Sequence, residues 1–102
     1  MKFNKLSPAE EERLAKLTEE CGEISQMVGK TLVHGWASYH PRDPEQVSNR
    51  AKLEKEVGGL LAVVDIMIAA ADLNPDAIES AKVIKAATIW KYLHHQGEYH
   101  GL

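Results

Sequence analysis

The segment Thr18-Glu19-Glu20-Cys21-Gly22-Glu23-Ile24 places three carboxylates close together on a predicted helix. Like charges three or four residues apart repel each other and weaken an isolated helix by roughly 0.2–0.5 kcal/mol per pair. A second acidic segment, Leu53-Glu54-Lys55-Glu56-Val57-Gly58-Gly59, follows on the next predicted helix. We expect the two segments to face each other in the fold and to hold a hard divalent cation, which would relieve the repulsion.

Three helices are predicted from start signals in the sequence and from apolar residues at helical spacing. Ser7-Pro8-Ala9-Glu10 combines an N-cap serine, a proline at the first helical position and a glutamate that closes a capping box. The first helix is expected to run from there to about His34, where Gly35 is a C-terminal stop. The second helix is expected over residues 48–73, and the third over residues 75–94.

On the first helix, an apolar stripe is expected to form the core. Its members recur at steps of three and four residues: Leu14, Leu17, Cys21, Ile24, Val28 and Leu32. Glu20 and Glu23 border this stripe, and the thiol of Cys21 is expected to be buried and inert. On the second helix, which we expect to be the most buried element, Glu56 and Gly59 lie beside the apolar face at the same angles. This agreement predicts one shared site.

The chain has 102 residues, of which 44% are hydrophobic and 6% aromatic. This length fits one domain with a modest core, and the composition suits helices packed on helices. We therefore expect an all-α, antiparallel bundle of about three to four helices in a single domain over residues 1–102, with flexible ends at 1–6 and 97–102. So small a core is expected to be completed by homo-oligomerisation, as a homodimer or a homotetramer.

Charge and composition restrict the partners and the compartment. The net charge is −3 and the isoelectric point is near 5.9, with basic residues scattered along the chain, which disfavours nucleic-acid binding. The single cysteine excludes an internal disulfide framework and fits a reducing compartment. No signal peptide is expected, and the longest apolar run, 58–71, is interrupted by Asp65 and too short to cross a bilayer. We expect a cytoplasmic protein with neither nucleic-acid nor membrane partners.

Residues 35–47 are predicted to form a loop between the first two helices, because Pro41 and Pro44 prevent a regular helix there. A connection of this length between helices is often functional or mobile. The loop side chains able to stack on a base or to contact phosphate are Trp36, Tyr39, His40 and Arg42. An alternative for Trp36 is a hydrophobic plug over the end of the bundle.

The residue types of the two acidic segments fit a magnesium site. Mg²⁺ prefers oxygen ligands in octahedral geometry, and substrate phosphates often complete the sphere begun by protein carboxylates. Glu20 and Glu23, together with Glu56 from the neighbouring helix, form a partial cage of this kind. The alternative is a solvated acidic strip screened by Lys16 and Lys30.

The run from Leu17 to Ile24 resembles the Glu-Glu-x-x-Glu motif of MazG-like all-α nucleotide pyrophosphohydrolases, in particular the short single-domain members of bacteriophages. The similarity covers roughly residues 12–96 and includes residues 30–39, Asn49-Arg50, 53–67 and 94–96. The second motif of that family is Glu-x-x-Asp, whereas this chain has Glu56-Val57-Gly58-Gly59, so that Gly59 stands at the aspartate position.

This resemblance implies hydrolysis of a nucleoside or deoxynucleoside triphosphate to the monophosphate and pyrophosphate, with Mg²⁺ as cofactor and Mn²⁺ as an alternative. It implies Glu20, Glu23 and Glu56 as metal ligands. It also implies Glu19, as an outer partner or base, or Glu23, as the carboxylate that takes a proton from water. The residues expected to bind the substrate are Lys30, Trp36, Arg50 and Lys52. A phage-encoded protein would act in the host cytoplasm.

Two other functions stay open. Because Gly59 cannot bind a cation through a side chain, the chain could be a catalytically weakened or inactive relative that acts as a nucleotide-binding or helical assembly protein. The other is a plain helical interaction module whose acidic strip is merely solvated.

Overall fold

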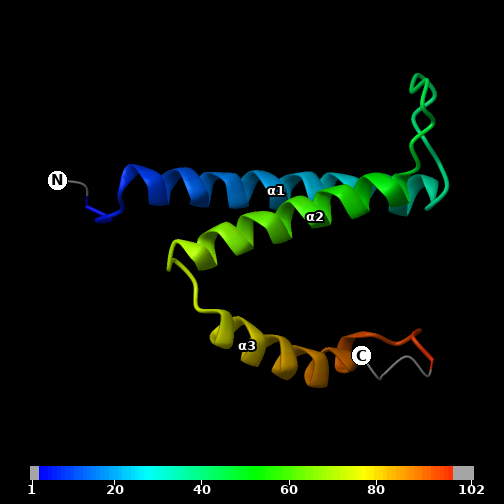
Figure 1. Cartoon of the computed structure of the whole chain (residues 1–102). Helices are drawn as coiled ribbons and strands as arrows, with labels where there is room; N and C mark the ends of the chain where they lie inside the picture. Colours follow the sequence, from blue (N-terminus) through cyan, green and yellow to red (C-terminus); the bar gives the residue numbers. More distant parts are fainter. Residues whose placement is uncertain (1–2, 98–102) are drawn as a thin grey trace.

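The computed structural model describes residues 3–97 and is all-helical over this range. In chain order it contains α1 (Pro8–His34), α2 (Asn49–Ala69), α3 (Pro75–Thr88) and the short 3₁₀ helix η1 (Ile89–Tyr92). Helices α1 and α2 run antiparallel and pack side by side, and a loop at one end joins them (Figure 1). The predicted all-α class is confirmed, while the outermost parts of the predicted flexible ends, 1–2 and 98–102, lie outside the described residues.

The helices begin where the capping signals of the sequence predict. At the start of α1, the Ser7 hydroxyl accepts a hydrogen bond from the Glu10 backbone N–H at 3.1 Å, and the Glu10 carboxylate accepts one from the Ser7 N–H at 2.9 Å. This capping box lowers the pKa of the Glu10 carboxyl, because the hydrogen bonds stabilise its charged form. Ser48 caps α2, Asn74 caps α3, and Gly35 ends α1 with a φ of 88°.

Helix α2 ends before the predicted boundary near Leu73, in a Schellman motif. The Asp72 N–H donates to the Met67 carbonyl at 2.8 Å, and the Ala71 N–H donates to the Ile68 carbonyl at 3.0 Å. Ala71 has the left-handed φ of 64° that this motif requires. Glycine favours this conformation, so an alanine in its place gave no sign of the helix end in the sequence. The motif turns Asp72 back toward α1.

Arg13 and Asp72 join the beginning of α1 to the residues that follow α2. The Arg13 guanidinium donates two hydrogen bonds to the Asp72 carboxylate, from Nε to Oδ2 at 2.6 Å and from Nη2 to Oδ1 at 3.0 Å. These hydrogen bonds hold the pKa of the Asp72 carboxyl below its usual range. A bidentate pair fixes geometry as well as adding energy, so this contact sets the register of α1 against α2.

The side of α1 that packs against α2 is not the predicted apolar stripe. The buried residues of the described chain are Glu20, Met27, Asn49, Val63 and Met67. Most of the stripe is open to solvent instead: Leu14 and Val28 are both 41% exposed and Leu32 is 83% exposed, while Leu17 and Ile24 are half-buried. Cys21, expected to be buried, is exposed as well. Within one chain, the acidic strip therefore lies in the helix interface and the apolar stripe lies outside it.

Several exposed or half-buried apolar residues of α1 and α2 lie on one side of the helix pair. Val28 lies roughly 80° around α1 from the buried Glu20, and Val57 lies roughly 120° around α2 from the buried Val63, in the same rotational sense. In two antiparallel helices, displacement in the same sense brings both sets of side chains to the same side. We call this surface the apolar face; its members are Leu14, Cys21, Val28, Leu32, Leu53 and Val57.

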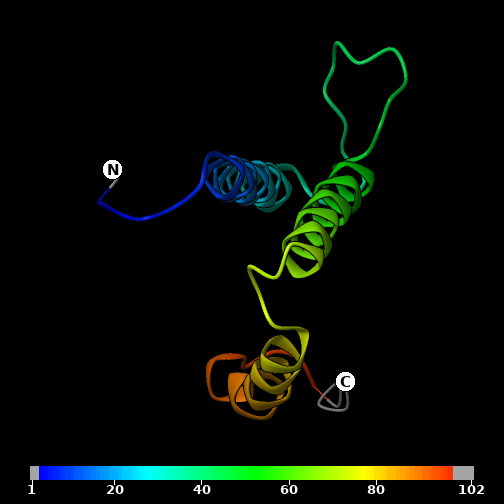
Figure 2. The same cartoon turned by 60° about the vertical axis from the view of Figure 1, so that its left-hand side comes forward.

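The described chain is much more extended than a closed bundle of its length. Its radius of gyration is 17.3 Å, whereas a compact domain of about 100 residues has roughly 13 Å. Helix α3 makes no interface with α1 or α2 comparable with the one between those two helices, and Figure 2 shows it set apart from them. Its Val83 and Ile84 are more than half exposed. Within one chain, only two of the predicted bundle helices are packed together.

Replacing Ala71 with glycine is expected to stabilise the fold. Glycine has no Cβ to strain the left-handed conformation, so Ala71→Gly should raise the free energy of unfolding by about 1 kcal/mol. Urea unfolding followed by circular dichroism measures this change. Ala62→Gly is the matched control, since the same substitution inside α2 should lower the free energy of unfolding by about 1 kcal/mol. A similar loss for both variants would contradict the role assigned to residue 71.

Candidate active site

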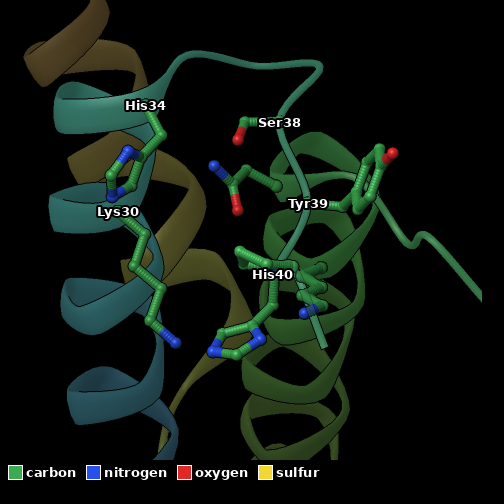
Figure 3. Close-up of a pocket in the computed structure, with 8 residues that line it drawn as sticks. Lys30, His34, Ser38, Tyr39 and His40 are labelled. Atoms are coloured by element: carbon green, nitrogen blue, oxygen red, sulfur yellow. The ribbon is translucent and has the colours of Figure 1, made fainter. Parts of the chain in front are cut away.

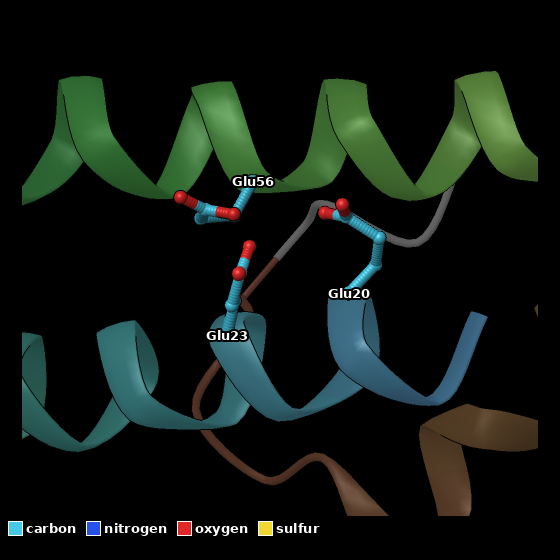
Figure 4. A group of neighbouring side chains, drawn as sticks. All are labelled: Glu20, Glu23 and Glu56. Atoms are coloured by element: carbon cyan, nitrogen blue, oxygen red, sulfur yellow. The ribbon is translucent and has the colours of Figure 1, made fainter. Parts of the chain in front are cut away.

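Three glutamates converge in the interface between α1 and α2. Glu20 and Glu23 lie on the same side of α1, and Glu56 reaches them from α2 (Figure 4). One carboxylate oxygen from each residue lies within 4.8 Å of the other two. We call these residues the glutamate cluster; Glu20 is buried and the other two are half-buried. The two acidic segments therefore meet, as their matching positions on the two helices predict.

The lack of a side chain at Gly59 makes room for Glu20. A Cβ added to Gly59 would lie 2.6 Å from Oε2 of Glu20 and 3.2 Å from its Cδ, which is too close for nonbonded atoms. Oε1 of Glu20 is 3.8 Å from the Lys16 Nζ, and this attraction offsets part of the cost of burying a carboxylate. The glycine at the aspartate position of the second motif is thus a point of close approach between the two helices.

Glu23 and Glu56 form a pair of interacting carboxyl groups. Figure 4 shows them pointing toward each other, and the interaction with Glu56 is the main reason that the pKa of the Glu23 carboxyl is raised above its ordinary value. Partial burial and repulsion by Glu56 and Glu19 act in the same direction, whereas Lys16 opposes them. Because a cation competes with protons for the Glu23 carboxylate, and the raised pKa of Glu23 favours the proton, cation binding should strengthen as the pH rises.

Glu19, predicted as an outer partner or base, lies outside the glutamate cluster. Its carboxylate accepts a hydrogen bond from the Lys16 Nζ at 3.2 Å, and its side chain is 55% exposed. The interaction with Glu19 raises the pKa of the Lys16 ammonium. Of the two predicted bases, Glu23 is the one that lies in the cluster.

The glutamate cluster fits a magnesium ion in donor type and in spacing. Mg²⁺ takes oxygen ligands at about 2.0–2.1 Å, so oxygens on opposite sides of its octahedron lie about 4.2 Å apart. The oxygens of Glu20, Glu23 and Glu56 lie within 4.8 Å of each other, so small side-chain rotations would bring them into this range. Three carboxylates leave positions for water or for phosphate oxygens, which Mg²⁺ sites commonly retain.

A group of basic and hydroxyl side chains lies beside the glutamates. A pocket of about 210 Å³ opens between the end of α1, the loop and the start of α2 (Figure 3). We call it the basic pocket; its lining includes Lys30, His34, Ser38, Tyr39, His40 and Lys52. Lys30 is about 10 Å along α1 from Glu23, and Lys52 is about 6 Å along α2 from Glu56, given the rise of an α-helix. The basic pocket is therefore the neighbour of the glutamate cluster.

The four predicted substrate-binding residues divide into two pairs. Lys30 and Lys52 both line the basic pocket. Trp36 and Arg50 contact each other instead, with the Arg50 Cζ 5.2 Å from the centroid of the Trp36 ring. They border an open groove whose apolar lining is Leu53, Val57 and Leu61. Trp36 is 50% exposed, so it does not plug the end of a bundle within one chain.

Three further residues that line the pocket, His34, Ser38 and Asn49, were not predicted as site residues. Asn49 is buried at the start of α2, where its N–H donates to the Ser38 carbonyl at 2.8 Å and its Nδ2 donates to the Gly35 carbonyl at 3.0 Å. These hydrogen bonds bring the beginning of the loop against α2. The one available signal was the four-residue spacing of Lys30 and His34, which places both on one side of α1.

Comparison of the chain with protein-family models, with curated proteins and with solved structures finds no match. The resemblance to MazG-like proteins therefore stays a prediction from the motif residues. None of the helices in residues 3–97 combines the length and the hydropathy that a membrane span needs.

Divalent cations are expected to stabilise the fold in a pH-dependent manner. The pKa of Glu23 is higher in the folded protein than its ordinary value of 4.5. Protonated Glu23 therefore stabilises the fold fully below pH 4.5, and this stabilisation is lost as the pH rises through the raised pKa. Mg²⁺ or Mn²⁺ should therefore raise the melting temperature at pH 7.5, and this increment should shrink as the pH falls toward 5. Differential scanning fluorimetry with and without metal measures it.

Two variants test whether the glutamate cluster is the source of the metal-dependent rise in melting temperature. Glu23→Gln should abolish most of the metal-dependent rise in melting temperature while stabilising the metal-free protein at pH 7.5, because it removes one of two repelling carboxylates. Glu19→Gln makes the same change of charge outside the cluster and should keep the rise. Equal loss in both variants would mean that the cation is attracted only by diffuse negative charge.

Proposed function

We propose that this chain is a magnesium-dependent nucleoside triphosphate pyrophosphohydrolase of the MazG-like kind, acting in the cytoplasm. The observation that supports it best is the convergence of Glu20, Glu23 and Glu56 beside the basic pocket. Carboxylates able to hold a cation, next to ammonium groups that attract phosphate, are the two components that phosphoryl transfer requires. The resemblance of residues 17–24 and Glu56 to the family motifs supports the same assignment.

The residues of the two clusters take separate roles in this reaction. Bound Mg²⁺ would supply neutralisation of the charge on the phosphate oxygens. Glu23, whose carboxyl has a raised pKa, takes the proton of the attacking water. The water oxygen bonds to the α-phosphorus as the bond to the α–β bridging oxygen breaks, and the electron pair of that bond leaves with pyrophosphate. Lys30 and Lys52 hold the outer phosphates.

A second candidate function is a nucleotide-binding protein with weak or no turnover. It is favoured by Gly59, because the space where the family has a fourth carboxylate is taken by the Glu20 side chain. In this candidate the same residues bind nucleotide and cation, but the cation is held by too few carboxylates for efficient chemistry.

Pyrophosphate release separates the two candidates. The wild-type chain with Mg²⁺ or Mn²⁺ should release pyrophosphate from one or more members of a panel of nucleoside and deoxynucleoside triphosphates, and Glu23→Gln should lower the rate by about 100-fold. Gly59→Asp should raise the rate, because the flexible end of Glu20 can move aside for a fourth carboxylate.

Matched substitutions control this assay. Glu54→Gln removes an exposed carboxylate from α2 outside the cluster and should leave the rate unchanged. Gly59→Ala displaces Glu20 without adding a ligand, so it should not reproduce the gain of Gly59→Asp. Nucleotide binding without any pyrophosphate release, in the wild type and in Gly59→Asp alike, would select the second candidate.

We also propose that the chain forms a homodimer through the apolar face, so that two helix pairs make a four-helix bundle. Three observations support this: the exposure of apolar side chains on both helices, the radius of gyration of 17.3 Å, and the lack of any comparable packing for α3. By the same helical geometry, the basic pocket residue Lys30 and Glu23 lie on the opposite rotational side of α1 from Val28. Association through the apolar face therefore leaves the site open.

A charge placed on the apolar face is expected to produce monomers. Val28→Glu and Val57→Glu should each convert the dimer to a monomer in size-exclusion chromatography with light scattering, because association would bury an unpaired carboxylate. Ile66→Glu is the control: Ile66 is 56% exposed but lies on the other side of α2, so this variant should remain dimeric. A wild-type monomer at micromolar concentration would overturn the proposal, and a tetramer would require a second interface.

A further inference from the structure

The basic pocket offers several hydrogen-bond donors and little negative charge. Within residues 3–97 no carboxylate forms an ion pair with Lys30, and the Lys52 Nζ is 4.0 Å from Oδ2 of Asp43, at the outer limit for an ion pair. The hydroxyl group of Ser38 adds a neutral donor. In Figure 3 the Lys30 ammonium and the His40 ring extend toward each other from α1 and from the loop.

Asp43 is engaged mainly by the loop backbone. Its two carboxylate oxygens accept hydrogen bonds from the Glu45 N–H at 2.9 Å and from the Val47 N–H at 3.0 Å. These bonds lower the pKa of the Asp43 carboxyl and hold it in the loop rather than in the pocket. The charge of Lys52 is therefore only partly compensated, and it is available to a ligand.

The loop also sets the hydrogen-bonding state of His40. Nδ1 of His40 accepts a hydrogen bond from the Arg42 N–H at 3.0 Å, so the hydrogen of the neutral ring is on Nε2. With Nδ1 occupied in this way, His40 offers the pocket a donor and no acceptor. Together with the two ammonium groups, this makes the pocket selective for an anion with several acceptor oxygens.

We infer that the basic pocket binds a pyrophosphate group, by direct contacts from Lys30, Lys52 and His40 that require no metal. Its volume of about 210 Å³ lies below the roughly 300–1,000 Å³ of pockets for drug-sized ligands, so it suits a small anion rather than a whole nucleotide. The neighbouring glutamates repel an extended polyanion such as a nucleic acid, which favours a short one.

This inference extends the proposed function, because it sets the orientation of the triphosphate chain in the site. If a nucleoside triphosphate is the substrate, its β- and γ-phosphates occupy the basic pocket and its α-phosphate lies over the glutamate cluster, about 6–10 Å away along the helices. The leaving pyrophosphate then departs from the basic pocket, at the end of α1 beside the loop. This orientation rests on the proposed function, whereas the binding of pyrophosphate itself does not.

Isothermal titration of the full chain with inorganic pyrophosphate, in the presence of EDTA to exclude divalent metals, tests the pocket. Saturable binding is expected, and it should be roughly tenfold tighter than that of inorganic phosphate, because a second phosphate adds charge-assisted hydrogen bonds. Lys30→Gln and Lys52→Gln should each weaken pyrophosphate binding roughly tenfold, and Lys30→Arg should restore most of it.

Lys55→Gln is the matched control, because it removes the same charge from an exposed position of α2 outside the pocket and should weaken binding by less than about twofold. Circular dichroism of each variant verifies that it is folded. Absence of pyrophosphate binding by the wild type, equal affinity for phosphate, or an equal effect of Lys55→Gln would each overturn the inference.

A competition experiment distinguishes a free pyrophosphate site from a site for the end of a nucleotide. Displacement of pyrophosphate by a triphosphate with a non-hydrolysable α–β linkage supports the proposed orientation, and failure of displacement overturns it while leaving the pyrophosphate site intact. The readout is independent of turnover. Pyrophosphate binding together with no hydrolysis of any nucleotide would therefore reject the proposed function and keep the pocket.

Discussion

The close approach of α1 and α2 depends on accommodating carboxylates within the interface of two helices. Glu20 is buried there because Gly59 has no side chain to obstruct it, and Lys16 lies near enough to reduce its cost. Glu23 and Glu56 point toward each other from the two helices, and this contact raises the pKa of the Glu23 carboxyl. The raised pKa of Glu23 means that the charge of this cluster and the packing of the helix pair depend on each other.

The helix pair is divided into two sides with different properties. One side carries the apolar face, which nothing in residues 3–97 covers, and the other opens onto the glutamate cluster and the basic pocket. Such a division suits a protein that associates through one side and binds a small anion through the other. It also accounts for the exposed Cys21, which belongs to the apolar face rather than to the site.

The fold was predictable from the sequence where local chemistry decides it. The capping residues Ser7 and Asn74 and the stop at Gly35 lie where the sequence placed them. The glutamate cluster followed from matching phases on two helices. The helical spacing of apolar residues identified the apolar stripe. It did not show whether the stripe is covered by the same chain or by another one. The left-handed Ala71 and the hydrogen bonds of Asn49 depend on tertiary contacts. The end of α2 and the position of the loop against α2 therefore had no signature in the sequence, although Lys30 and Lys52 were predicted to bind the substrate.

The bidentate ion pair between Arg13 and Asp72 affects the alignment of the distant glutamate cluster. An α-helix is a stiff rod, so a bidentate contact near one end of the pair fixes the axial position of Glu23 about 15 Å further along α1. Sliding one helix past the other by a single turn, about 5.4 Å, would carry Glu56 out of reach of its two partners. Arg13 and Asp72 thus set the alignment of the three glutamates without being part of the cluster. An insertion or deletion near the end of α2 would therefore misalign the carboxylates.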